Sequence, residues 1–145
     1  MRKSSRRSAR ASRRTRPPRQ IDARGRAGRR VSARVTSEFW VAAYLRRAMS
    51  EGAFAALRKR GAAEAGAIFV KLDLLDGRAR LYGPAPQALA AEDGHRTFVR
   101  LHASDDVTPL DAEERLVKQL RFDDDLWIVE IEDRRGRSFL DLAEG

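Results

Sequence analysis

Apolar and polar residues alternate on both sides of the dipeptide Asp76-Gly77, over residues 66–83. Asp-Gly favours a two-residue hairpin loop, because both central residues of such a loop take positive φ. A loop at this point pairs Leu72 with Leu81 and Lys71 with Tyr82. One face of the hairpin then holds Leu72, Leu74, Ala79 and Leu81, and the other holds Lys71, Asp73, Arg80 and Tyr82. The pattern therefore predicts an antiparallel hairpin over residues 66–83.

Two segments have the helical spacing of apolar residues. Ser37 is a good N-cap for a helix that ends near Ser50. This helix carries one apolar stripe, formed by Trp40, Val41, Tyr44, Leu45 and Ala48. Thr108 and Pro109 predict a second helix that ends near Arg121, because proline suits the first helical position. The side chains that we expect it to bury are Leu110, Leu116, Val117 and Leu120.

Shorter runs predict the remaining strands. Residues 53–60 alternate enough to fit a strand, although their alanine content also suits a helix, and residues 97–102 alternate clearly. Residues 126–132 lead through a turn at 133–137 into residues 138–142, which predicts a C-terminal hairpin. The element order predicts an α+β fold with one mostly antiparallel β-sheet, built on the two hairpins, and two main helices packed on one of its faces.

The positive charge of the chain lies in its first 30 residues. The whole chain has a formal net charge of +9, but residues 1–30 hold 13 basic side chains against the single acid Asp22. The remainder carries 17 basic and 20 acidic side chains and is slightly acidic. We therefore expect residues 1–30 to form a disordered arm and residues 31–145 to form a single α+β domain.

Three interpretations of this arm compete. Its arginines suit non-specific binding of nucleic-acid phosphates, and the candidate residues are Arg6, Arg7, Arg10, Arg13, Arg14, Arg16 and Arg19. The composition also resembles a mitochondrial transit peptide, but the segment lacks an apolar face. The third interpretation, which the sequence favours slightly, is an over-long gene model in which translation begins near Val31.

Composition narrows the class of protein. The chain has no cysteine, which excludes disulfides, thiolate metal sites and a cysteine nucleophile. No apolar run approaches the roughly 18 residues of a membrane span, and the N-terminus lacks the apolar middle of a secretory signal. These features predict a cytoplasmic protein without membrane association.

Motifs of catalysis and cofactor binding are missing from the sequence. It contains no Gly-rich phosphate loop, no nucleophile elbow and no metal-binding histidine spacing, so we expect no cofactor. His95 and His102 are interpreted as surface residues. Trp40 and Tyr44 suit a ligand site but fit a core stripe better. The basic run Arg58, Lys59 and Arg60 suits phosphate binding but is more typical of a solvated strand end.

Acidic residues raise two further hypotheses. A dense group that suits Mg²⁺ or Ca²⁺ comprises Asp123, Asp124, Asp125, Glu130, Glu132 and Asp133. Its members do not clearly converge, so a solvated helix exit followed by a charged edge strand is the better interpretation. The element order also matches the core of restriction-endonuclease-like nucleases. Asp73 lies on the appropriate strand, but residues 78–82 supply no acid for the metal, which argues against this activity.

Several motifs together resemble a known family. These are residues 38–47 (EFWVAAYLRR), residues 66–72 (GAIFVKL), Asp76-Gly77, residues 81–86 (LYGPAP), the stretch from Phe122 to Asp133, and Arg135-Gly136 before Phe139-Leu140. In this order they resemble the bacterial family known as domain of unknown function 1491, over residues 35–142. The resemblance implies a compact single domain with no established activity. The resemblance also implies that family members begin shortly before residue 38. Residues 1–30 depart from that pattern, which favours a translation start near Val31.

The sequence thus favours a non-catalytic cytosolic domain that binds an unknown protein partner. The alternative hypothesis is a nucleic-acid or ribosome-associated protein that binds phosphate backbones through residues 1–30. No residue is predicted to be catalytic or to hold a metal.

Overall fold

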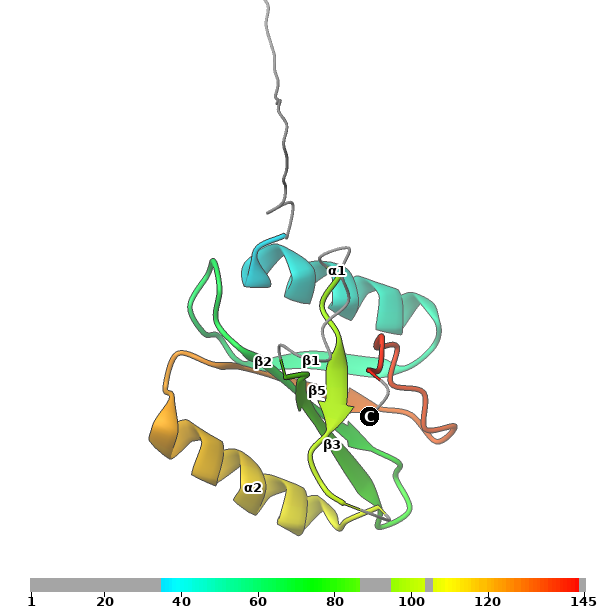
Figure 1. The fold of residues 1–145 in the computed structure, drawn as a ribbon. Coiled ribbons are helices and arrows are strands. Elements are labelled where there is room, and N and C mark those ends of the chain that lie inside the picture. Colours follow the sequence, from blue (N-terminus) through cyan, green and yellow to red (C-terminus); the bar gives the residue numbers. More distant parts are fainter. Residues whose placement is uncertain (1–34, 87–94, 104–105, 144–145) are drawn as a thin grey trace, which may run out of the picture. The chain divides into compact units, whose positions relative to one another are not determined.

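The computed structural model describes residues 35–86, 95–103 and 106–143 (Figure 1). All of them belong to the compact unit Val35–Gly145. Its elements are α1 (Ser37–Ser50), β1 (Phe54–Lys59), β2 (Ile68–Asp73), β3 (Ala79–Pro84), β4 (Phe98–Arg100), α2 (Pro109–Phe122) and β5 (Trp127–Glu132). The arm at residues 1–30, with its seven candidate arginines, lies outside the described residues.

Five strands form one mixed sheet in the order β1-β5-β2-β3-β4. The β2–β5 pair is parallel, and the other three pairs are antiparallel. The predicted α+β class with a mostly antiparallel sheet is therefore confirmed. The strand at residues 53–60 is confirmed as β1, but β1 pairs with β5 and not with β2.

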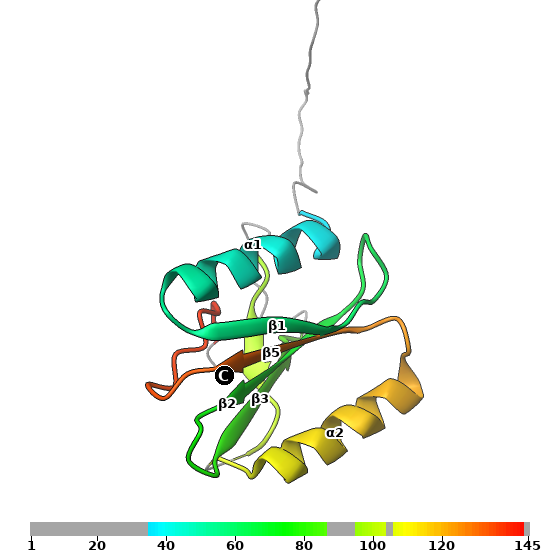
Figure 2. The same ribbon diagram turned by 180° about the vertical axis from the view of Figure 1, so that it is seen from behind.

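Helices α1 and α2 cover opposite faces of the sheet, so the prediction of helices on one face is wrong. Alternate residues of β2 point to different cores: Val70 packs with Val41 of α1, whereas Phe69 packs with Leu116 of α2. Figures 1 and 2 show α1 on one side of the strands and α2 on the other. The reason is that β2 and β5 are central strands with continuous apolar runs, which are buried on both faces.

The central hairpin forms as predicted between β2 and β3, but its register differs by one residue. Asp73 pairs with Ala79 and Lys71 pairs with Leu81. The loop therefore has five residues, closed by a hydrogen bond of 3.0 Å from the amide of Leu74 to the oxygen of Arg78. Leu75 in this loop takes a positive φ of 64°. The shift places Tyr82 in the core beneath α1, although the predicted register placed it on the opposite face from the leucines.

The predicted C-terminal hairpin does not form. The turn at 133–137 is present, with Gly136 at a φ of 75° and its amide 3.0 Å from the oxygen of Asp133. The chain then leaves β5 and crosses to β4, where Leu142 makes one parallel bridge with Phe98. This last segment covers the outer edge of β4.

Local signals located α1 and α2, but the cap of α1 and the side chains that α2 buries differ from the prediction. Thr36, rather than Ser37, caps α1, and Ser37 is buried with its hydroxyl donating to the oxygen of Gly66 at 2.6 Å. Thr108 caps α2 as predicted. Leu116 of α2 is buried, but Leu110 and Val117 are exposed. The buried stripe of α2 is therefore narrow, formed by Ala112 and Leu116.

Candidate functional site

A small cleft lies between α1 and the segment that follows β5. Its volume is about 170 Å³, and it is lined by Trp40, Ala43, Tyr44, Arg47, Arg96, Phe139 and Asp141. We call it the aromatic cleft. Figures 1 and 2 both show the final red segment beside the C-terminal half of α1. Helical geometry places Trp40, Tyr44 and Arg47 on neighbouring turns of one side of α1, because residues three and four apart are neighbours.

Stacked aromatic rings form one wall of the aromatic cleft. The rings of Trp40 and Tyr44 lie 4.8 Å apart with 13° between their planes, and Trp40 also contacts Phe98 at 5.2 Å. The Tyr44 hydroxyl donates to the main-chain oxygen of Ser138 at 2.5 Å. Burial raises the pKa of the Tyr44 phenol well above its usual value. Tyr44 is therefore a neutral structural anchor, and Trp40 presents a rigid apolar surface.

Phe139 forms the opposite wall in an uncommon backbone conformation. Its φ is 58°, in the left-handed region that bulky residues rarely adopt. Neighbouring contacts hold it there: the Tyr44 bond fixes Ser138, whose hydroxyl accepts the amide of Leu140 at 3.2 Å. The guanidinium of Arg137 lies over the Phe139 ring at 5.1 Å. Strain of this kind persists only where the surroundings impose it, and it is concentrated at functional sites.

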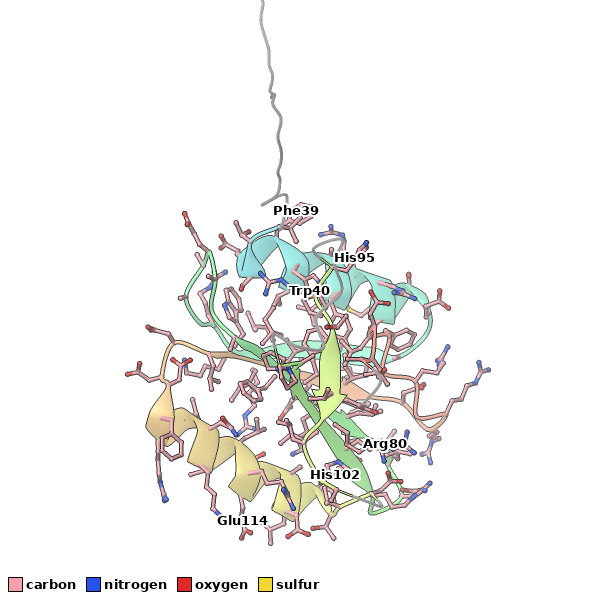
Figure 3. The ribbon with its side chains drawn as sticks, in the orientation of Figure 1. Phe39, Trp40, Arg80, His95, His102 and Glu114 are labelled. Carbon is pink, nitrogen blue, oxygen red and sulfur yellow. The ribbon has the colours of Figure 1, made fainter. Side chains whose placement is uncertain are left out.

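Two guanidinium groups and one carboxylate complete the lining. Arg96 donates to the main-chain oxygen of Val35 at 2.9 Å, and Asp141 lies 4.0 Å from the imidazole of His95. Figure 3 shows Trp40 and His95 on the same side of the domain, near α1. Arg47 is exposed in the last turn of α1, and no carboxylate of the described residues pairs with it. The cleft thus offers an available cation beside aromatic surface.

Comparison with known protein families shows to which family this chain belongs. The family model described as "Protein of unknown function (DUF1491)" matches residues 35–141. The chain belongs to the DUF1491 family. This finding confirms the resemblance that the sequence motifs suggested, and it carries no established activity. No curated protein matches the chain.

Three solved structures that are similar to this chain have the same fold. A solution structure of an A. tumefaciens protein shares 42% sequence identity with a TM-score of 0.66, and the match covers 77% of this chain and 97% of that one. The crystal structure of a DUF1491 protein from Caulobacter crescentus shares 36% identity with a TM-score of 0.63, covering 77% of this chain and 98% of that one. An NMR structure of a DUF1491 protein from the same species shares 39% identity with a TM-score of 0.63, and the match covers 77% of this chain and 97% of that one.

On the α2 side of the sheet, this DUF1491 domain has a network of four charged side chains. Glu113 of α2 accepts from Arg58 of β1 at 2.7 Å and from Lys71 of β2 at 3.1 Å, and Glu130 of β5 also pairs with Arg58 at 3.1 Å. Hydrogen bonding from Arg58 lowers the pKa of Glu113 to about 2. A carboxylate held in this form is a poor general base near neutral pH. The network fastens α2 to three strands.

The basic run Arg58, Lys59 and Arg60, which suited phosphate binding, makes its contacts with other groups of the protein. Arg58 belongs to the charged network. Lys59 donates to the main-chain oxygens of Asp124 at 2.6 Å and Leu126 at 3.1 Å. Arg60 pairs with Glu38 at 2.6 Å and lies 5.2 Å from the centre of the Trp127 ring. These contacts make the run a structural element of the sheet edge.

The acidic residues do not form one site. Asp123, Asp124 and Asp125 are exposed, with ligand atoms within 4.8 Å of one another. Glu130 instead pairs with Arg58, and Asp133 pairs with Arg137 at 2.9 Å. The comparison with nuclease cores is weakened further, because β5 separates β1 from β2. The carboxylate of Asp73 instead accepts a hydrogen bond from the amide of Leu75 in the loop, at 2.7 Å.

The histidines differ from each other in environment. His95 is exposed, as predicted, but His102 is buried, so the prediction of a surface residue is wrong for His102. Its Nε2 accepts the main-chain amide of Leu81 at 3.2 Å. Strand β4 ends at Arg100, and the imidazole of His102 then supplies an acceptor to β3. Figure 3 shows His102 near the α2 side of the domain.

The described helices are short and amphipathic. Within residues 35–86, 95–103 and 106–143, no helix is long and apolar enough to cross a membrane.

Proposed function

We propose that the domain Val35–Gly145 is a cytoplasmic protein-interaction module that holds part of a partner protein in the aromatic cleft. The observation that carries this proposal is the composition of the cleft, where Trp40, Phe139 and an available Arg47 surround a hollow of about 170 Å³. Tryptophan, tyrosine and arginine are the residues that most often dominate the energy of protein interfaces.

The rigidity of the cleft supports binding over catalysis. Trp40 is fixed by stacking on Tyr44, and Tyr44 is fixed by its bond to Ser138. A site that is already ordered loses little conformational entropy when a partner docks. The one phenol in the lining has a raised pKa and a main-chain acceptor, so it is unsuited to act as a base or a nucleophile near neutral pH. The absence of cysteine from the sequence suits a reducing cytoplasm.

Site-specific photo-cross-linking tests this proposal. A photoreactive residue replaces Phe39 in the full chain, which is then irradiated in its native cells. Phe39 is an exposed aromatic residue of α1, one helical turn before Ala43, and it does not line the aromatic cleft, so the change leaves the cleft open. We expect one discrete adduct that disappears when Trp40→Ala is added. The matched control places the same group at Lys118, which lies on α2 and outside the aromatic cleft. Equal adducts at both positions, or no adduct at residue 39, would contradict an interaction through this cleft.

A second candidate function rests on the basic arm of the chain. Residues 1–30 concentrate 13 basic side chains, a density suited to nucleic-acid backbones or ribosomal RNA. The residues that we propose for these contacts are Arg6, Arg7, Arg10, Arg13, Arg14, Arg16 and Arg19. Mass spectrometry of the native N-terminus tests whether the arm is translated. Duplex DNA binding should then weaken steeply with salt and vanish on deletion of residues 1–30, and salt-insensitive binding would argue against this function.

A further inference from the structure

A second, larger cleft lies at the end of the sheet next to the aromatic cleft. Its volume is about 450 Å³, and its lining comes from the end of α1, the start of β1, the β2–β3 loop and the turn after β5. Two of its side chains are large and apolar yet well exposed, with Phe54 58% and Leu75 41% accessible. Exposed apolar side chains gathered around a hollow mark a surface that suits a partner. We call this hollow the loop cleft.

The two clefts are neighbours, because residues that line one lie beside residues that line the other. Arg137 lines the loop cleft, and its guanidinium lies over the ring of Phe139, which lines the aromatic cleft. On α1, Arg47 lines the aromatic cleft and Glu51, four residues later, lines the loop cleft. Four residues of α-helix rise about 6 Å, a distance that an extended chain covers in about two residues. One extended segment can therefore reach both clefts.

Backbone strain marks both clefts in the same way. Within the described residues, the non-glycine positions with positive φ are Leu75 at 64° and Phe139 at 58°. Leu75 lines the loop cleft and Phe139 lines the aromatic cleft. Each is a bulky residue in a backbone conformation that glycine adopts at a lower free-energy cost, and each lines one of the two clefts. Strained residues that line adjacent hollows point to a shared binding role.

The charged side chains around the clefts indicate which charge a bound partner segment should have. The aromatic cleft is lined by Arg47 and Arg96 against the single acid Asp141. Arg47 has no ion pair among residues 35–86, 95–103 and 106–143, whereas Arg58, Arg80 and Arg137 are paired. A carboxylate at Arg47 would gain a charge-assisted hydrogen bond beside the aromatic wall. In the loop cleft, Asp133 pairs with Arg137, and the remaining charged side chains of the lining balance in sign: Glu51, Glu132, Arg134 and Arg135. The loop cleft therefore favours neither charge, and its apolar anchors are Phe54 and Leu75.

We propose that the two clefts together bind one extended segment of a partner protein that bears two large apolar side chains and a carboxylate. One apolar side chain occupies the aromatic cleft with the carboxylate at Arg47. The other, about two to four residues away in an extended chain, packs on Phe54 and Leu75 in the loop cleft. This inference rests on the proposed function, and it adds the second cleft and the chemistry of the partner.

A peptide selection provides the test. A phage library of random 12-residue peptides is selected on the full chain in about 0.5 M NaCl, which screens contacts to the basic arm. Peptides that also bind the Ala43→Gln chain are removed, because glutamine fills the aromatic cleft while the arm stays the same. We expect the remaining peptides to share an acidic residue beside an apolar one, with a second apolar residue nearby. Affinity for one labelled peptide is then measured by fluorescence polarisation.

Three variants separate the possible outcomes. Leu75→Gly removes an anchor at a position where glycine suits the backbone, so it should weaken binding at least tenfold without loss of thermal stability. Arg47→Glu should weaken binding similarly, and a peptide with lysine in place of its acid should recover it. Leu110→Ala removes an exposed leucine on α2 and should leave affinity within twofold.

Two results would overturn the inference. If Leu75→Gly binds like the wild-type chain while Ala43→Gln does not, the partner uses the aromatic cleft alone, and the proposed function survives without this extension. If no peptide remains after selection against Ala43→Gln, both the extension and the proposed function are wrong.

Discussion

The hydroxyl of Tyr44 lies 2.5 Å from the main-chain oxygen of Ser138, and this bond joins the first helix to the segment after the last strand. The two residues are 94 positions apart in the chain. Tyr44 lines the aromatic cleft, and its bond holds Ser138, the neighbour of Phe139 in the same lining. This long-range hydrogen bond therefore helps to hold the shape of the cleft.

Tyr44→Phe should loosen this junction. The change removes the donor and leaves the Ser138 oxygen without it, a loss of about 1–2 kcal/mol in the free energy of unfolding. Thermal denaturation should show a melting temperature several degrees lower. Phe39→Leu is the matched control, because Phe39 is an exposed aromatic residue on the same helix. Equal melting temperatures for wild type and Tyr44→Phe would mean that the junction is held by packing alone.

Gly66→Ala should be among the most damaging small substitutions in the domain. A Cβ at Gly66 would lie 2.6 Å from the main-chain oxygen of Asp125 and 2.8 Å from that of Ala62, and main-chain atoms cannot move aside cheaply. We expect a loss of about 3 kcal/mol or more in the free energy of unfolding, measured by urea denaturation.

Gly77→Ala provides the comparison for this glycine. Gly77 has a φ of 90° but open space around its Cβ position, so its substitution adds backbone strain without a collision. The cost should be about 1–2 kcal/mol. If both variants lost the same stability, the close approach of residue 66 to Asp125 would not be the cause.

The Glu113 carboxylate should make the domain sensitive to acid. Its pKa is lowered to about 2 in the folded chain, from 4.5 in the unfolded chain. The ionised form is thus favoured by folding, and its stabilising effect is complete above pH 4.5 and lost as the pH falls from 4.5 towards 2. Because its side chain is 31% exposed, solvent screening reduces the effect to about 1–2 kcal/mol.

Glu113→Gln tests this dependence. The variant should be less stable than wild type at pH 6, and the difference between the two unfolding free energies should shrink as the pH falls towards 2. Glu114→Gln changes the neighbouring residue, which has no ion pair in the part of the chain that the structure describes. A difference that stays constant from pH 6 to pH 2 would rule out this carboxylate as the acid-sensitive group.

His102→Leu should destabilise the edge of the sheet. Leucine fills a similar space but cannot accept the amide of Leu81, and a buried amide without an acceptor costs about 1–3 kcal/mol. Hydrogen exchange at the Leu81 amide should become faster relative to the amides of β2. His102→Gln keeps an acceptor and should recover part of the protection. Unchanged exchange in the leucine variant would show that another group satisfies this amide.

Signals carried by neighbouring residues predicted much of the fold. Thr108 and Pro109 located the start of α2, and the alternation around Asp76-Gly77 located the β2–β3 hairpin, because capping and turn formation depend on a few adjacent residues. The register was missed because Leu75 takes positive φ and lengthens the loop, a conformation that its residue type disfavours. No rule based on residue type favours leucine at such a position.

Long-range pairing was the part that the sequence did not reveal. The parallel pairing of β2 with β5 joins strands that are far apart in the chain, and no adjacent residue specifies it. The continuous apolar runs Ile68-Phe69-Val70 and Trp127-Ile128-Val129 were the available signal for strands buried on both faces. The aromatic cleft was missed for a related reason. Trp40 and Tyr44 belong to the core and to the cleft at once, and the opposite wall is Phe139, which the predicted hairpin had placed elsewhere.

The position of β5 in the sheet also bears on how the protein is made. This strand is the last of those that the structure describes, yet it lies between β1 and β2 and is the neighbour of both. While a ribosome has not yet released Trp127–Glu132, β1 has no strand to pair with and β2 has one open side. Exposed apolar strand edges favour aggregation and chaperone binding. The sheet can therefore close only after Trp127–Glu132 has left the ribosome, and a product truncated before Trp127 should be removed by proteolysis.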